Sequence, residues 1–192
     1  MKNYSLLLMF LCFGMSLLSC KHTATDSFEE ELSAFMDSQI DFPLDSMLYM
    51  GDSTTDFHRE KYMYVVYTDT SSCSECAIKN FSNWADLDLQ SCLERQKLSY
   101  IFIVAPPRNL RKRIIDKIRQ DCLFRSFVFV DTSGCFERQN PSLLRREMMH
   151  SFLVDDSSRV KLVGNPTINN KVKSLLLKMI VDSVTDKSIQ SK

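Results

Sequence analysis

The sequence carries no excess of charge of either sign, because its 192 residues contain 24 Lys and Arg and 24 Asp and Glu. Domains that bind nucleic acid usually carry a clear basic surplus. The one locally basic run, residues 108–119, has apolar residues at helical spacing, so we interpret its charges as the solvated face of a helix. We therefore expect no nucleic-acid partner.

The chain also lacks a second pair of metal ligands. Cys73 and Cys76 form a Cys-x-x-Cys motif, a spacing found at zinc sites, but such a site needs a second ligand pair at similarly short spacing. His58 and His150 are isolated in the sequence, and no internal repeat or low-complexity tract occurs. We therefore expect neither a metal nor another cofactor.

The apolar run at residues 6–18 is too short to cross a bilayer once its flanks are considered. It follows the positively charged Lys2, as the apolar core of a signal peptide does, so we assign residues 1–19 to a signal peptide. The run ends in Leu17-Leu18-Ser19-Cys20, which resembles the bacterial lipobox.

That resemblance implies cleavage before Cys20 and attachment of acyl chains, such as palmitate, to the new N-terminal cysteine. Several acyl chains are enough for stable anchoring. The expected location is therefore the cell envelope, with the protein anchored by lipid and facing the periplasm, on either the inner or the outer membrane. The alternative is an ordinary secretory signal peptide in which Cys20 is incidental.

Cleavage there would leave 173 residues, enough for one domain with a well-developed core. Lys2 is the single charged residue lost, so 23 basic and 24 acidic residues remain and the net charge becomes −1. We assign residues 20–60 to a tether, a short helix and an irregular N-terminal segment. Residues 61–192 form the main domain.

Within the main domain, apolar runs alternate with helix-like stretches. The predicted elements are strands at 61–68, 98–104 and 126–130, helices at 74–90 and 108–120, a helical turn at 142–148, a hairpin of strands 151–154 and 159–163, and a helix around 172–180. A helix near 28–36 and a short strand near 46–50 precede them. The first strands are continuously apolar, as in parallel sheets buried on both faces. The order predicts an α/β fold whose central mixed sheet combines parallel strands with a C-terminal antiparallel hairpin, flanked by helices.

Cys73 and Cys76 lie where the first of these strands gives way to a helix. Cys73 is then at the helix N-terminus, where unpaired N–H groups and the positive end of the helix dipole stabilise a thiolate. The thiolate is the nucleophile in disulfide exchange. We therefore predict that Cys73 attacks, and that Cys76, one turn later on the same face, resolves the mixed disulfide.

The remaining cysteines leave the pairing open. Five cysteines follow Cys20, which is an odd number. If Cys73 pairs with Cys76, the other three (Cys92, Cys122 and Cys135) can supply at most one more bridge. Disulfides persist outside the cytoplasm, so the predicted compartment permits these bonds without requiring them.

The element order, with Cys-x-x-Cys after its first strand, resembles the thioredoxin-like superfamily over residues 61–182. Phe152-Leu153-Val154-Asp155 and the valine-rich strand after it are similar to the extracytoplasmic, membrane-anchored redoxin branch. The resemblance implies a thioredoxin-like fold and thiol-disulfide oxidoreductase activity. Two positions depart from the family's pattern. Ser72 stands where a tryptophan usually precedes the first cysteine, and Met149 stands where a cis-proline usually faces the disulfide. A cis peptide before Met149 is costly, so we expect a trans peptide.

Glu75 is the residue between the cysteines that we expect to affect their chemistry most. Its negative charge opposes ionisation of Cys73, and no Lys, Arg or His lies between the cysteines to offset it. We therefore expect thioredoxin-like acidity for Cys73, which suits a reductant or isomerase better than a strong oxidant.

Other residues are candidates for supporting roles. Asp69 can accept a proton from Cys76 through water, or can be a turn residue. His150 can donate a hydrogen bond to a bound sulfur, or can be structural. Cys135 can resolve a mixed disulfide, or can be a buried small apolar residue. Met149 is a further candidate for a supporting role, because it stands where the resembling family has the cis-proline that faces the disulfide.

The sequence thus predicts a lipid-anchored, extracytoplasmic thiol-disulfide oxidoreductase that reduces or isomerises disulfides. Its expected partners are exported cysteine-containing proteins, an upstream membrane electron donor, and the membrane itself through the N-terminal lipid. Ser72 and Met149 keep an alternative open, a non-catalytic thioredoxin-fold lipoprotein that acts as a binding or scaffold module. A peroxidase is less favoured, because the threonine-proline-x-x-cysteine setting of peroxidatic cysteines is missing.

Overall fold

The computed structural model describes residues 24–51, 59–84, 87, 98–121, 127–143 and 146–190. The chain divides into two compact units, Met1–Ser33 and Ala34–Lys192. The described part of the first unit belongs to helix α2 (Ala24–Phe35), which begins a few residues before the helix predicted near 28–36. The second unit holds the cysteine motif and is described below by itself.

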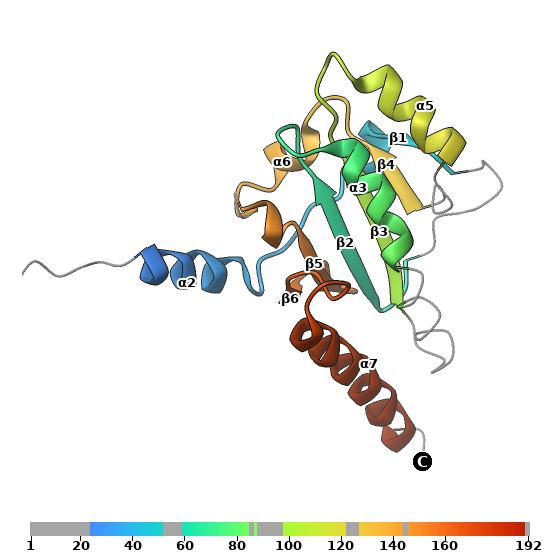
Figure 1. The fold of residues 1–192 in the computed structure, drawn as a ribbon. Helices are drawn as coiled ribbons and strands as arrows, with labels where there is room; N and C mark the ends of the chain where they lie inside the picture. The colour runs from blue at the N-terminus through green and yellow to red at the C-terminus, as the bar shows by residue number, and fades with distance from the viewer. Residues whose placement is uncertain are drawn as a thin grey trace, which may run out of the picture. The chain divides into compact units, whose positions relative to one another are not determined.

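The second unit is built on one six-stranded mixed sheet, with the strand order β1-β4-β3-β2-β5-β6 (Figure 1). The strands are β1 (Leu48–Tyr49), β2 (Tyr62–Thr68), β3 (Leu98–Val104), β4 (Val128–Val130), β5 (Ser151–Asp155) and β6 (Val160–Val163). β2, β3 and β4 are parallel, whereas β1 and the β5–β6 hairpin are antiparallel to their neighbours. The predicted α/β fold with a mixed sheet is confirmed, and its layout is consistent with a thioredoxin-like arrangement.

The register of β2 places the cysteine loop at the C-terminal end of the parallel strands. Tyr62 is opposite Leu98 and Thr68 is opposite Val104, so β2 and β3 end at the same level. β5 runs the other way, and its first residue, Ser151, pairs with Val66 near the end of β2. The loop before the cysteines and the segment leading into β5 therefore meet at this same end of the sheet.

Except for α6, the helices agree with the predicted ones in place but not in every boundary. They are α3 (Ser74–Asn80), α5 (Arg111–Asp121), α6 (Cys135–Gln139) and α7 (Asn170–Gln190). The α-helix predicted over 74–90 ends at Asn80 and continues as a 3-10 helix, η3 (Phe81–Trp84); residues 85–86 and 88–90 lie outside the described ranges. Residues 108–110 form a turn after two prolines, so α5 begins three residues later than predicted.

Two smaller differences follow the helices. Strand β4 covers the last three residues of the strand predicted at 126–130. Of the helical turn predicted at 142–148, only the last two residues belong to a helix, the 3-10 helix η5 (Glu147–Met149), and residues 144–145 lie outside the described ranges. Helix α6 was not predicted. It forms because the Asp131 carboxylate accepts hydrogen bonds from the N–H groups of Cys135 and Phe136, which satisfies the first turn of the helix from outside.

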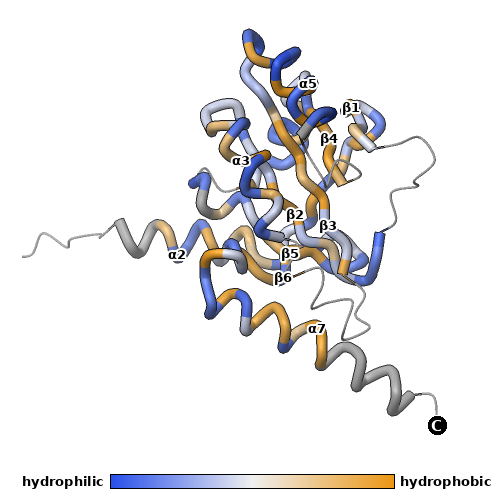
Figure 2. Tube along the Cα trace, turned by 45° about the vertical axis from the view of Figure 1, so that its right-hand side comes forward, coloured by the Kyte–Doolittle hydropathy of each residue, from blue (hydrophilic) through white to orange (hydrophobic). Residues whose placement is uncertain are grey.

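Both faces of the sheet are covered, which explains the continuous apolar strands. One face carries Tyr64 and Phe102 and packs against residues of α3, η3, α5 and α7, including Phe81, Trp84 and Leu176. On the opposite face, Phe152 contacts Phe35 and Tyr67 contacts Phe136. In Figure 2 the hydrophobic colour follows the strands, whereas α5 alternates between hydrophilic and hydrophobic residues. All seven residues of β3 are buried.

Candidate active site: the Cys73–Cys76 disulfide

A turn held by Asp69 brings Cys73 to the start of α3. Asp69 Oδ1 accepts hydrogen bonds from the backbone N–H of Ser71 (2.9 Å) and Ser72 (2.8 Å) and from both of their hydroxyls (2.8 and 2.7 Å). Asx turns of this kind fix the chain direction without secondary structure. These contacts fit the second of the two roles suggested for Asp69, that of a turn residue.

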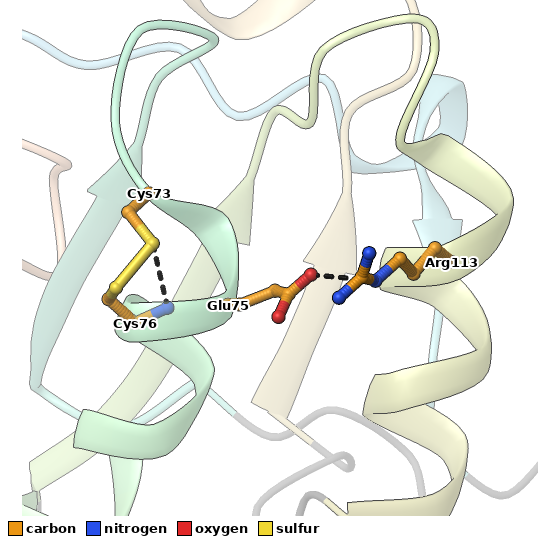
Figure 3. Close-up of a disulfide and its surroundings, with 4 residues drawn as sticks. All are labelled: Cys73, Glu75, Cys76 and Arg113. Carbon is orange, nitrogen blue, oxygen red and sulfur yellow. Dashed lines mark hydrogen bonds and ion pairs between the residues drawn. A yellow bond between two sulfur atoms is a disulfide. The ribbon is translucent and has the colours of Figure 1, made fainter.

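Cys73 is the N-cap residue of α3. Its Sγ accepts a hydrogen bond from the backbone N–H of Cys76 at 3.3 Å, and the two cysteines are joined by a disulfide (Figure 3). Both cysteines are exposed. The same N–H group can donate to a Cys73 thiolate once the disulfide is reduced, and hydrogen bonding to the charged form favours that form. The pair therefore fits a redox-active Cys-x-x-Cys motif.

The two serines beside Cys73 are buried. Ser72, at the position where the resembling family has tryptophan, is held in the turn by Asp69, and Ser74 begins the helix. The hydroxyl oxygen of Ser74 has no hydrogen-bond partner within the described part of the chain. Neither serine presents an aromatic surface beside the disulfide.

Glu75 points away from the disulfide and pairs with a cation on another helix. Its Oε1 lies 2.8 Å from Nε of Arg113, in α5 (Figure 3). The sequence offered no local signal for this pairing, because the motif contains no cation and the two residues are far apart along the chain. The sequence analysis considered the residues between the cysteines, and the cation that pairs with Glu75 comes from outside them.

Asp69, which follows β2, and His150, which precedes β5, lie close together. His150 is 4 % exposed, its ring centroid is 5.2 Å from that of Tyr67, and its Nδ1 lies 3.8 Å from Asp69 Oδ2. Burial raises the pKa of Asp69, but the hydrogen bonds from Ser72 and Ser71 outweigh it, so the pKa lies below its usual value. Asp69 is therefore an ionised turn residue at neutral pH.

Met149 occupies the position where the resembling family has a cis-proline. No cis peptide bond occurs within the described ranges, so the peptide before Met149 is trans, as expected. The backbone N–H of Met149 donates to the Arg146 carbonyl at 2.8 Å, and the next carbonyl, of His150, accepts from the N–H of Tyr67 at 2.8 Å. The segment thus docks on β2 through His150.

A groove of about 340 Å³ opens beside the two cysteines. Its lining is both apolar and polar, and the apolar part includes Val66, Ala77, Phe81 and Trp84. Polar groups and one exposed apolar residue complete the lining: Thr68, Asn80, Glu147, Ser151, Asn165 and Ile168 are among them. Ile168 is 81 % exposed. Trp84 is buried in the core and also borders the groove.

Cys135 is a buried free thiol away from this groove. Its Sγ donates to Asp131 Oδ1 at 3.4 Å, at the start of α6. The structure therefore agrees with the buried small residue rather than with a resolving cysteine at the surface. Cys20, Cys92 and Cys122 lie outside the described residues.

Neither a metal-binding cluster nor a membrane-spanning helix occurs among the described residues. They hold no cluster of three His, Cys, Asp or Glu side chains placed to bind a metal ion. Nor do they include a helix whose length and apolar character would let it span a membrane. Comparison with protein-family models, with curated proteins and with solved structures gave no match.

Proposed function

We propose that this protein is a thiol-disulfide oxidoreductase of the thioredoxin-like kind. The observation that supports the proposal is the exposed Cys73–Cys76 disulfide at the start of α3, where both cysteines line a groove. In the reaction, the Cys73 thiolate attacks a client disulfide and releases one client thiolate. Cys76 then attacks Cys73 Sγ, which releases the second client thiolate and restores the Cys73–Cys76 disulfide.

We further propose that the protein acts outside the cytoplasm, anchored through lipid on Cys20, and that its clients are exported proteins with cysteines. The support is the lipobox-like Leu17-Leu18-Ser19-Cys20. Two electrons must reach the disulfide for each client reduced. A membrane dithiol donor, which is itself oxidised to a disulfide, would supply them.

Mixed-disulfide trapping in the native host tests the proposal. Cys76→Ala leaves the attacking thiol without its resolving partner, so this variant should accumulate discrete adducts with exported proteins on non-reducing gels. Cys73→Ala should capture none, and serves as the matched control. If neither variant captures a protein, and the wild-type pair does not equilibrate with a glutathione buffer, the oxidoreductase proposal fails.

A binding or scaffold module is the second candidate. Ser72 and Met149 favour it, since the side chains that resembling enzymes place beside the disulfide differ here. A scaffold would bind its partner with the cysteines idle. Its partner should then be captured equally well by wild type and by a variant in which both cysteines are changed to serine, whereas the oxidoreductase proposal requires loss of capture.

A further inference from the structure

The ion pair between Glu75 and Arg113 connects the helix that carries the cysteines to α5. Glu75 lies between the two cysteines, and its carboxylate reaches across to α5 rather than toward the sulfur atoms (Figure 3). Arg113 therefore affects Glu75 in two ways. The guanidinium offsets the negative charge of Glu75, and it holds the Glu75 carboxylate on the side of α3 that faces away from Cys73.

We propose that Arg113 is a positioning residue that sets the acidity of Cys73 by acting on Glu75. The inference rests on the proposed oxidoreductase function and deepens it. Reduction of the disulfide by a dithiol donor consumes two electrons and leaves a Cys73 thiolate and a Cys76 thiol, with one proton released. Of the two reduced cysteines, only Cys73 is charged, so only it is repelled by an unpaired Glu75.

Arg113 thereby favours the thiolate and the reduced form of the site. Without it, the Glu75 charge acts on Cys73 unopposed, Cys73 holds its proton more tightly, and the disulfide becomes harder to reduce. The expected size is modest, because Glu75 is 32 % exposed and Arg113 is 70 % exposed, so water and salt screen both.

Other charged or titratable groups surround the site, and the experiment must separate their effects from that of Arg113. Asp69 and His150 lie at the end of β2, and Glu147 lines the groove beside the cysteines. On the α5 side, further charged residues line a second pocket together with Glu75 and Arg113: Lys112, Asp116 and Lys117. Of these residues, Arg113 forms the ion pair with Glu75 at 2.8 Å.

Arg119 provides a matched control on the same helix. It is 60 % exposed and lies 3.9 Å from Asp116, within α5 itself. Arg119→Gln therefore removes the same charge from the same helix without touching Glu75. Arg113→Lys provides the complementary control. It keeps a positive charge near Glu75, so the acidity of Cys73 should stay close to that of the protein with Arg113.

The test measures Cys73 acidity directly. In the reduced full-length chain carrying Cys76→Ser, the rate of Cys73 alkylation by iodoacetamide is followed against pH, with the Cys73 peptide identified by mass spectrometry. Arg113→Gln should raise the apparent pKa and slow alkylation at neutral pH about two- to threefold, and added salt should shrink the difference. Arg119→Gln should have no such effect. With Glu75→Gln already present, Arg113→Gln should change nothing further.

The inference is overturned if Arg113→Gln behaves like Arg119→Gln, or if it slows alkylation equally with and without Glu75. Equilibration of the wild-type pair with glutathione gives a second readout, in which Arg113→Gln should shift the constant about two- to threefold toward the disulfide. Alkylation needs neither a client nor an electron donor. A pKa effect of Arg113 in a protein that traps no client would therefore reject the proposed function while keeping this inference.

Discussion

The buried hydroxyl of Tyr64, in the middle of β2, donates a hydrogen bond to the carbonyl oxygen of Gly164, just after β6. This bond joins the central strand to the loop that leads into α7. Gly164 has a φ of +120°, and a Cβ there would lie 3.0 Å from Cγ2 of Val172. Burial strongly raises the pKa of Tyr64, so the hydroxyl keeps its proton and remains a donor.

Tyr64→Phe should therefore destabilise the protein. It removes one hydrogen bond and leaves the Gly164 carbonyl without its partner, at a cost of about 1–2 kcal/mol in the free energy of unfolding. Urea unfolding followed by far-UV circular dichroism measures this. Tyr62→Phe, in a half-buried side chain of the same strand, is the control and should cost less than about 0.5 kcal/mol. Equal effects of the two changes would contradict the assigned role of Tyr64.

Asp131 makes stability depend on acid pH. Burial raises the pKa of Asp131, but hydrogen bonds from the N–H groups of Phe136 and Cys135 outweigh it, so the folded-state pKa lies below its usual value. Such a group stabilises the folded state fully above its unfolded pKa of about 3.9, and the contribution is lost as the pH falls through the lower, folded-state value.

Asp131→Asn should lower stability at pH 7 by about 1–3 kcal/mol, because Asp131 uses both oxygens as acceptors and an amide nitrogen cannot accept. It should also flatten the loss of stability below pH 4, since the variant no longer titrates there. Urea titrations between pH 7 and pH 3 test both effects. Asp45→Asn, at an exposed position, should leave the profile unchanged. A variant profile parallel to wild type would argue against Asp131 as the source.

Asn140 fastens the segment before β1 to α6. Its side-chain amide donates to the carbonyls of Asp41 (2.9 Å) and Phe136 (2.8 Å), and its Oδ1 accepts from the N–H of Asp41 (2.8 Å). Because Asn140 is buried, Asn140→Ala removes these bonds and leaves both Asp41 groups without this partner, so it should cost about 1–3 kcal/mol by urea unfolding. Asn109→Ala, at an exposed position, should be close to neutral. A neutral Asn140→Ala would show that these groups find other partners.

Trp84 offers a spectroscopic report of the redox state. It is the single tryptophan in the chain, it is 3 % exposed, and it lines the groove together with Cys73 and Cys76. A nearby disulfide quenches an excited indole, so reduction with dithiothreitol should raise the emission of Trp84. The variant with both cysteines changed to serine should show no response. Identical responses in the two proteins would place the origin of the signal away from the disulfide.

Local patterns in the sequence determined most of the sheet. The apolar runs at 61–68 and 98–104 became β2 and β3, and the turn at 155–158 became the link of the β5–β6 hairpin, because side-chain periodicity and turn chemistry act over a few residues. The position of Cys73 at the junction of a strand and a helix was readable for the same reason. Local chemistry also identified Cys73–Cys76 as the candidate redox pair.

The tertiary structure decided which side chains from other elements lie near the Cys73–Cys76 pair. Arg113 meets Glu75 only because α3 and α5 lie side by side after the sheet forms, and no spacing rule connects two residues in different helices. Helix α6 depends on a carboxylate that precedes it, and the groove beside the cysteines gathers residues from β2, η3, η5 and the loop after β6. Charge neutralisation and groove shape are properties of distances between segments, so they became visible only once the chain was folded.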